Sequence, residues 1–244
     1  MMFRDALCFF TRLPLGAPSA TASFQGVVAW MPAVGLIVGL IMAGTLWLCA
    51  TLLPTPLCGL SACLVWIAVT GGLHLDGVAD CGDGLFVEAL RERRLEIMQD
   101  SRLGAFGVIA LFFVLALKST ALALLGSGFV QGAYGFWTLL AVCALAATLG
   151  RCAVFAAARL PSARPGGMGA AASAGISRRH ERIALAVVLA LCLVTPRGFR
   201  ALLAALLVAC CLLLVAKRRL GGVTGDVFGC LVEITECATL LACV

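Results

Sequence analysis

Runs of apolar residues close to twenty positions long, and nearly free of charge, dominate this chain. They lie at about 27–53, 57–73, 103–125 and 136–158. A helix of roughly 20 apolar residues is long enough to cross the hydrocarbon core of a bilayer. Hydrophobic residues make up 62% of the 244 residues and charged residues 12%, against about 45–50% and about 25% in soluble domains. The sequence therefore predicts an all-α, polytopic transmembrane helix bundle.

Shorter segments complete the predicted bundle. Apolar runs at 183–195 and 201–216, and a last one after Gly222, bring the expected number of spans to about six or seven. The run at 183–195 is short for a span, so we expect it to be tilted or partly re-entrant. Residues 3–13 are too few and too charged to cross, and predict an interfacial N-terminal helix. No linker divides the chain, so residues 1–244 are expected to form a single integral membrane domain.

The positions of the basic residues predict an orientation. With seven spans and a cytoplasmic N-terminus, the inside segments hold the arginines of 91–102 and 159–182 and the basic residues of 217–219. The outside segments hold only Arg197 and Arg200. Cytoplasmic loops of membrane proteins are enriched in Lys and Arg. The net charge of +6 is spread between apolar runs rather than gathered in one basic domain, so nucleic acid is not an expected partner.

An acidic stretch, residues 71–104, follows the second apolar run and holds most of the acidic residues of the chain. Asp76, Asp80 and Asp83 recur at spacings of four and three, which place them on one face of a helix. Like charges so arranged repel unless a cation lies among them, and carboxylate oxygens are ligands that Mg²⁺ prefers. A solvated acidic cap is the simpler interpretation, but the glycines between the acids favour a Mg²⁺ site. His74 is expected to hydrogen-bond a phosphate or the neighbouring helix.

The last apolar segment contains a second acidic group, Asp226, Glu233 and Glu236. Acids inside an apolar helix are costly and are usually functional. Two uses are open for them, and the two are compatible with each other. They complete a carboxylate metal site, or they pair with Lys118 and Arg151, which lie inside predicted spans.

Carboxylates for a divalent metal and cations for phosphate together describe phosphoryl transfer on the cytoplasmic side. For most loop arginines, membrane topology is the simpler explanation. The residues predicted to bind substrate are Arg12, Ser101, Arg102, Lys118, Arg151 and Arg164.

Two alternatives to this interpretation remain. The acidic spacing resembles, without matching, the signature of the CDP-alcohol phosphotransferases of lipid synthesis, whose second aspartate pair is absent here. A cation- or proton-coupled transporter is the alternative outside enzymes. It would need inverted repeats and acids near the bilayer midplane, whereas Asp76 and its neighbours lie at the end of a span.

Several sequence blocks identify a more specific resemblance. In order and nearly end to end, the chain resembles the cobalamin synthase family, the adenosylcobinamide-GDP ribazoletransferases. Where that family commonly has Ala-Asp-Thr, this chain has Ala79-Asp80-Cys81, which leaves the acids intact. The matching blocks are FFTRLP (9–14), MPAVGLIVGL (31–40), GGLHLDGVADCGDG (71–84), LEIMQDSRLGAFG (95–107), Lys118, RPGGMG (164–169), GGVTGDVFG (221–229) and the Glu233/Glu236 pair.

The resemblance implies a reaction. A ribose hydroxyl of α-ribazole, or of its 5′-phosphate, attacks the cobinamide-linked phosphate of adenosylcobinamide-GDP, GMP leaves, and adenosylcobalamin or its 5′-phosphate forms with Mg²⁺. It also implies a multi-pass protein of the bacterial inner membrane, either a homo-oligomer or associated with other cobalamin-assembly enzymes.

The resemblance further implies a role for each candidate residue. Asp76, Asp80 and Asp83 would hold Mg²⁺ on the diphosphate, with Asp83 as general base and His74 in the catalytic group. The other acids would complete the metal shell or orient the cations, and three cations would stabilise the leaving GMP. These acids are Asp100, Asp226, Glu233 and Glu236, and the cations are Arg102, Lys118 and Arg151.

Overall fold

Helices account for nearly all of the ordered structure. The computed structural model describes residues 2–244, and in that part of the chain the extended backbone is limited to one isolated β-bridge, between Ser162 and Val223. The all-α prediction is therefore confirmed. The helices are α1 (Met2–Phe10), α2 (Phe24–Val27), a 3₁₀ turn (Val28–Trp30), α3 (Met31–Leu52), α4 (Thr55–Thr70), α5 (Leu75–Phe86), α6 (Arg91–Ile97), α7 (Ala105–Val130), α8 (Phe136–Ala157), α9 (Met168–Gly175), α10 (Arg178–Val194), α11 (Gly198–Leu220) and α12 (Gly225–Cys243).

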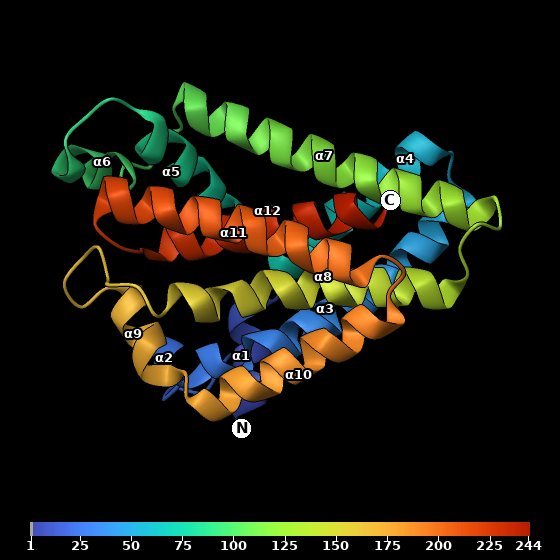
Figure 1. Ribbon diagram of the computed structural model, residues 1–244, viewed down its shortest axis with the longest axis horizontal. Helices are drawn as coiled ribbons and strands as arrows, with labels where there is room; N and C mark the ends of the chain where they lie inside the picture. Colours follow the sequence, from blue (N-terminus) through green and yellow to red (C-terminus); the bar gives the residue numbers. More distant parts are fainter. Residues whose placement is uncertain (1) are drawn as a thin grey trace.

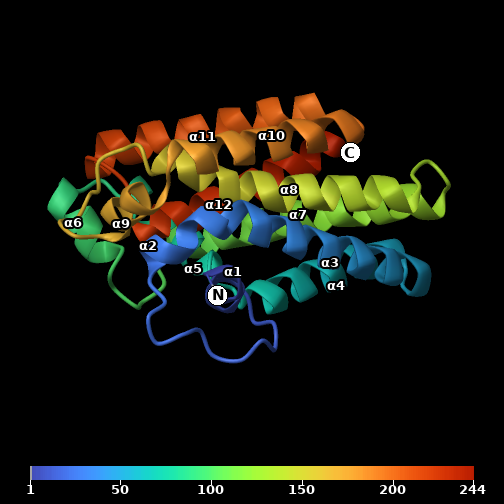
Figure 2. The same cartoon turned by 90° about the horizontal axis from the view of Figure 1, so that it is seen from below.

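The long helices run side by side around α12 (Figures 1 and 2). Helices α5, α7, α8 and α11 all pack against α12, and most of its residues are buried. By contrast, α7 and α11 present large apolar side chains such as Phe112 and Leu207 on their outer surfaces. In a bilayer these surfaces would face lipid, which leaves α12 as the protected centre of the bundle.

Four helical segments are long and apolar enough to cross a membrane, namely Phe24–Leu52, α7, α8 and α11. The bent pair α4 and α5 makes a fifth if it counts as one broken span. This count is below the six to seven spans expected. The two remaining long helices, α10 and α12, run along the same axis (Figure 1), but α10 has 17 residues and α12 carries three acids. The polytopic bundle is confirmed, and its span count is approximate.

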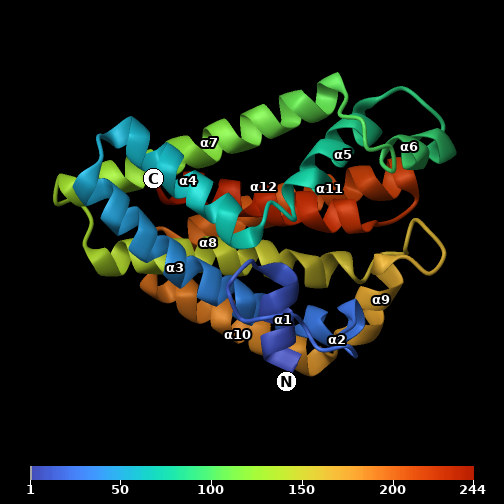
Figure 3. The ribbon, with the colours of Figure 1, turned by 180° about the vertical axis from the view of Figure 1, so that it is seen from behind.

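A sharp bend separates α4 from the acidic helix α5. Gly71 and Gly72 both have left-handed backbone angles, with φ of 67° and 66°, which L-residues with a side chain rarely adopt. The two helices consequently meet at 94°, and α5 leaves the axis that α4 follows (Figure 3). The acidic stretch thus begins with a helix that turns away from the span before it.

Two predicted boundaries were wrong. The segment 159–182, expected to be a polar loop, contains α9 and the first turn of α10, where the Ser177 hydroxyl accepts a hydrogen bond from the His180 backbone N–H. The apolar run expected at 103–125 also ends later than predicted, because α7 continues to Val130. The short run at 183–195 is the body of α10, which gains its length from this polar first turn.

Candidate active site

The acidic helix α5 lies directly against the start of α12, because glycines remove the side chains between them. A Cβ on Gly77 would collide with the Asp226 carbonyl and lie 3.0 Å from the Cys230 nitrogen, and one on Gly229 would lie 3.1 Å from the His74 carbonyl. This close contact brings Asp76 and Asp80 beside Asp226. Asp76 and Asp80 of the first acidic group therefore meet Asp226 of the second at one end of the bundle.

A bridge between two loops positions Arg164 beside Asp226. The Ala163 N–H donates to the Val223 carbonyl (2.9 Å), which ties the loop after α8 to the residues before α12. Arg164 Nη1 then lies 3.7 Å from Asp226 Oδ2, and the Thr224 hydroxyl donates to the same oxygen at 3.1 Å. A cation from the loop after α8 and a carboxylate from the first turn of α12 thus share this end of the bundle.

Asp83 holds the start of α7. Its two carboxylate oxygens accept hydrogen bonds from the backbone N–H groups of Gly104 (2.7 Å) and Gly107 (2.9 Å). The first N–H groups of a helix have no partner within the helix, and a carboxylate there also interacts favourably with the helix dipole. This geometry gives Asp83 a capping task that the sequence did not suggest.

Arginines cap the C-terminal end of α5. Buried Arg94 donates through Nη1 to the carbonyls of Gly84 (3.2 Å) and Leu85 (3.0 Å). Arg219 donates to the Leu85 carbonyl at 2.7 Å. Cations donate hydrogen bonds to the free carbonyls at the C-terminus of a helix and interact favourably with the helix dipole. These contacts explain why basic residues of α6 and α11 surround the acidic helix.

Deeper in the bundle, Lys118, Arg151, Glu233 and Glu236 form a closed ion network. Lys118 Nζ donates to Glu233 (2.8 Å) and Glu236 (2.5 Å), and Arg151 Nη1 donates to Glu236 (2.5 Å). At most 5% of any of these side chains is exposed. The pairing alternative is thus the one the structure contains. All four side chains bind one another and are enclosed, so the metal and phosphate roles predicted for them form no part of the arrangement at the acidic end.

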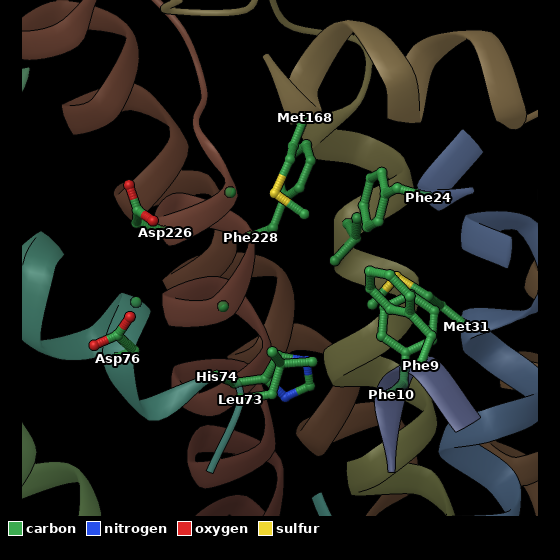
Figure 4. Close-up of a pocket in the computed structure, with 14 residues that line it drawn as sticks. Phe9, Phe10, Phe24, Met31, Leu73, His74, Asp76, Met168, Asp226 and Phe228 are labelled. Carbon is green, nitrogen blue, oxygen red and sulfur yellow. The ribbon is translucent and has the colours of Figure 1, made fainter. Parts of the chain in front are cut away.

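A cavity of about 220 Å³ lies beside the starts of α5 and α12. One side of the cavity is apolar and aromatic, and the other carries Asp76 and Asp226. His74 lies between the two sides (Figure 4). His74 is 5% exposed, and its Nδ1 has no hydrogen-bond partner in the described part of the chain. The apolar lining consists of Phe9, Phe10, Phe24, Met31, Leu73, Val154, Met168 and Phe228.

The remaining predicted residues lie at the surface, away from this cavity. Asp100 and Arg102 bind each other in the connection between α6 and α7, and Ser101 between them is exposed. Hydrogen bonds from Arg102 lower the pKa of Asp100 to about 2. Arg12 is exposed and packs against the bend at Gly71, where its backbone N–H donates to the Val69 carbonyl (2.7 Å).

The acids at this end suit a hard cation. The negative charges of Asp76, Asp83 and Asp226 all act on Asp80, and such mutual repulsion is relieved by a cation. No group of three or more His, Cys, Asp or Glu side chains in residues 2–244 has the geometry of a complete metal site. Mg²⁺ is usually bound by only one or two carboxylates, with water and substrate phosphates as further ligands. The donor set therefore fits Mg²⁺ that arrives with a phosphorylated substrate.

The aromatic side of the cavity was missed by the sequence interpretation. Phe9 and Phe10 were assigned to the interfacial helix and to the block FFTRLP without a binding role, and Phe24 stood in an unassigned segment. Phe228 follows Asp226 by two residues, so it leaves α12 on a different face. The one available signal was the density of phenylalanine near the N-terminus.

Comparison with known proteins places the chain in a family. The family model described as cobalamin-5-phosphate synthase matches residues 2–244. Proteins named adenosylcobinamide-GDP ribazoletransferase are 39% identical in Thermosynechococcus vestitus (97% of this chain, 93% of the relative), 40% identical in Stutzerimonas stutzeri (97% and 94%) and 35% identical in Klebsiella pneumoniae (98% of each). No solved structure gives a significant match. The full-length family match and these relatives show that the chain belongs to the cobalamin-5-phosphate synthase family.

Proposed function

We propose that this protein is a membrane-embedded adenosylcobinamide-GDP ribazoletransferase that performs the joining step of cobalamin synthesis at the α5–α12 end of the bundle. Family membership supports the transferase activity. The observation that carries the location is the meeting of Asp76 and Asp80 with Asp226 and Arg164. Asp76 and Asp226 line the cavity, and the guanidinium of Arg164 lies 3.7 Å from Asp226, which supports this location.

In this proposal a ribose oxygen of α-ribazole, or of its 5′-phosphate, forms a bond to the cobinamide-linked phosphorus. The bond from that phosphorus to the oxygen bridging the two phosphates breaks, and GMP leaves with the bridging oxygen. The hydroxyl proton passes to a carboxylate. Asp76 suits this step because it lines the cavity and has no capping task.

Asp80 and Asp226 would hold the metal, and Arg164 would bind phosphate oxygens, for which a guanidinium is suited. Bound Mg²⁺ would neutralise the diphosphate and stabilise the charge that develops on GMP. Asp83 was expected as general base, but both of its oxygens already accept backbone N–H groups. We therefore assign the role of general base, which accepts the hydroxyl proton, to Asp76 rather than to Asp83.

The two alternatives gain no support from the geometry. A coupled transporter would need titratable acids along a pathway through the bundle, but Glu233 and Glu236 are enclosed and paired. The resemblance to CDP-alcohol phosphotransferases was confined to the spacing of three aspartates in α5, whereas the match to the cobalamin-5-phosphate synthase family covers residues 2–244.

The test uses the protein in liposomes with adenosylcobinamide-GDP, α-ribazole and Mg²⁺, and measures release of GMP and formation of cobalamin. Asp76→Asn should lower kcat by about 10²–10⁴-fold, the usual contribution of a general base, with an unchanged Mg²⁺ requirement. Asp80→Asn and Asp226→Asn should instead raise the Mg²⁺ concentration needed. Glu96→Gln is the control, because that carboxylate is exposed and pairs only with Arg93. Full turnover by Asp76→Asn would contradict the assignment.

A further inference from the structure

We infer that the aromatic half of the cavity is the binding site for the dimethylbenzimidazole base of α-ribazole, an inference that rests on the proposed function. The cavity has two chemically different sides. Its apolar side combines α1, α2, α3, α8, α9 and α12, whereas its polar side comes from the starts of α5 and α12. A nucleoside with an apolar base and a hydroxyl-bearing sugar has the same division.

Four phenylalanines make the apolar side aromatic. The rings of Phe24 and Phe228 are nearly parallel, with an interplanar angle of 14° and centroids 6.4 Å apart. Phe9 and Phe10 pack on Phe24 with centroids at 6.0 and 6.3 Å. Aromatic rings bind other flat rings in offset-stacked or edge-on arrangements. This surface therefore favours a planar ligand over a flexible alkyl chain.

The size of the cavity excludes the larger substrate. At about 220 Å³ it is smaller than the roughly 300–1,000 Å³ of pockets that enclose a drug-sized ligand. It has room for one fused ring system and not for a corrin macrocycle. The corrinoid must therefore lie outside, with only its phosphates near the carboxylates.

The lining also discriminates between two flat bases. Guanine, the base of the other substrate, carries polar groups around its edge, and burying them without partners is costly. The aromatic side offers Phe, Met, Leu and Val side chains, none of which supplies a strong hydrogen bond. A benzimidazole with two methyl groups has a single free ring nitrogen as its polar group, and so loses far less than guanine in such surroundings.

His74 supplies an independent indication of a ligand. Its buried Nδ1 lacks a hydrogen-bond partner among residues 2–244, and the ring borders the cavity between the aromatic side and Asp76 (Figure 4). A buried polar atom of this kind normally has a partner. With the base on the phenylalanines, the sugar lies beside His74, and its hydroxyls reach toward Asp76.

The test measures KM separately for the two substrates. Phe24→Ala should raise KM for α-ribazole about tenfold, in line with the loss of one buried aromatic contact, and should leave KM for adenosylcobinamide-GDP unchanged. Phe24→Leu, which keeps an apolar side chain without a flat ring, should give an intermediate rise. Phe112→Ala is the control, since that ring lies on the outer surface of α7 and should change neither KM.

A ligand series sharpens the result. The wild-type protein should prefer α-ribazole to its analogue without the two methyl groups, and Phe24→Ala should reduce that preference. An unchanged KM for α-ribazole in Phe24→Ala and Phe24→Leu, or a rise for adenosylcobinamide-GDP instead, would overturn the inference while leaving the proposed function intact. Failure of the wild type to form any cobalamin would instead overturn the proposed function.

Discussion

Lys118 shows how a single side chain connects three helices of this bundle. It lies on α7, binds Glu233 and Glu236 of α12, and places its ammonium 4.4 Å from the ring centre of Trp66 on α4. Arg151 of α8 balances the second glutamate. The network thus contains two positive and two negative charges. Removing one member leaves an uncompensated charge in the core, which is far more costly than removing a neutral pair.

We therefore predict that Lys118→Met lowers the free energy of unfolding by about 3–5 kcal/mol, the usual cost of breaking a buried pair. Adding Glu233→Gln should restore part of the loss, because Glu236 and Arg151 then remain as a neutral pair. The measurement is thermal unfolding in detergent. Thr120→Met is the control, since it introduces the same side chain on an exposed position of α7. Equal melting temperatures for the Lys118→Met and Thr120→Met proteins would refute the prediction.

The candidate residues were found from the sequence, but their division into two groups was not. Helical spacing placed Asp226, Glu233 and Glu236 on related faces of one apolar segment. Spacing does not show which neighbouring helix lies beside each residue along the axis of α12. Packing decides this, because Asp226 is beside α5 and Arg164, whereas Glu233 lies one level deeper, beside Lys118.

At the scale of helices, the contact of α5 with α12 determines whether the acids meet. Gly77 lies at that contact and has backbone atoms of α12 where a side chain would be. Helices in membranes pack closely through small residues, since no solvent-driven force pushes them together. One methyl group at this position must separate the two helices.

Gly77→Ala should therefore lower stability by about 1–3 kcal/mol, as overpacking does, and should reduce transferase activity further by moving Asp76 and Asp80 away from Asp226. Gly44→Ala on α3 is the matched control, because no atom lies within 4 Å of the added methyl group. It should keep full activity and lose no stability. Melting temperature and GMP release of both variants provide the comparison, and a Gly77→Ala protein equal to Gly44→Ala would show that the contact is not needed.

Helices with a long apolar run were predicted well, and those without one were not. The bounds of α8 differ from the expected 136–158 by a single residue. In contrast, α9 was missed because the sequence MGAAASAG has no apolar period. The aromatic cavity was also beyond prediction, because it combines side chains from α1, α2 and α12 that are brought together only by folding.

At the scale of the whole molecule, cations mark one end of the bundle. Lys217, Arg218 and Arg219 end α11 near the start of α12, at the end that also carries α6 and α9 (Figure 1). At the opposite end, Arg197 and Arg200 donate to carbonyls of the last residues of α12. The positive-inside rule then supports a cytoplasmic candidate site and a C-terminus on the other side of the membrane.

We predict that alkaline phosphatase fused to the C-terminus is active in a bacterial host and that green fluorescent protein fused there is dark. The same fluorescent protein fused to the N-terminus should be bright, which controls for expression. A bright C-terminal fusion would contradict this orientation. It would also remove the cytoplasmic location proposed for the site, because α12 runs from Asp226 to that terminus.

The bend at Gly71 and Gly72 has a consequence for how reactants meet. If α5 continued α4 in a straight line, the carboxylates of α5 would extend along the direction of the span. Because α5 instead turns aside by 94°, its carboxylates stay at the rim of the bundle, beside the loop that bears Arg164. A water-soluble diphosphate can reach that rim from the aqueous phase without entering hydrocarbon. The two glycines thus allow a membrane-anchored protein to act on molecules that never dissolve in the membrane.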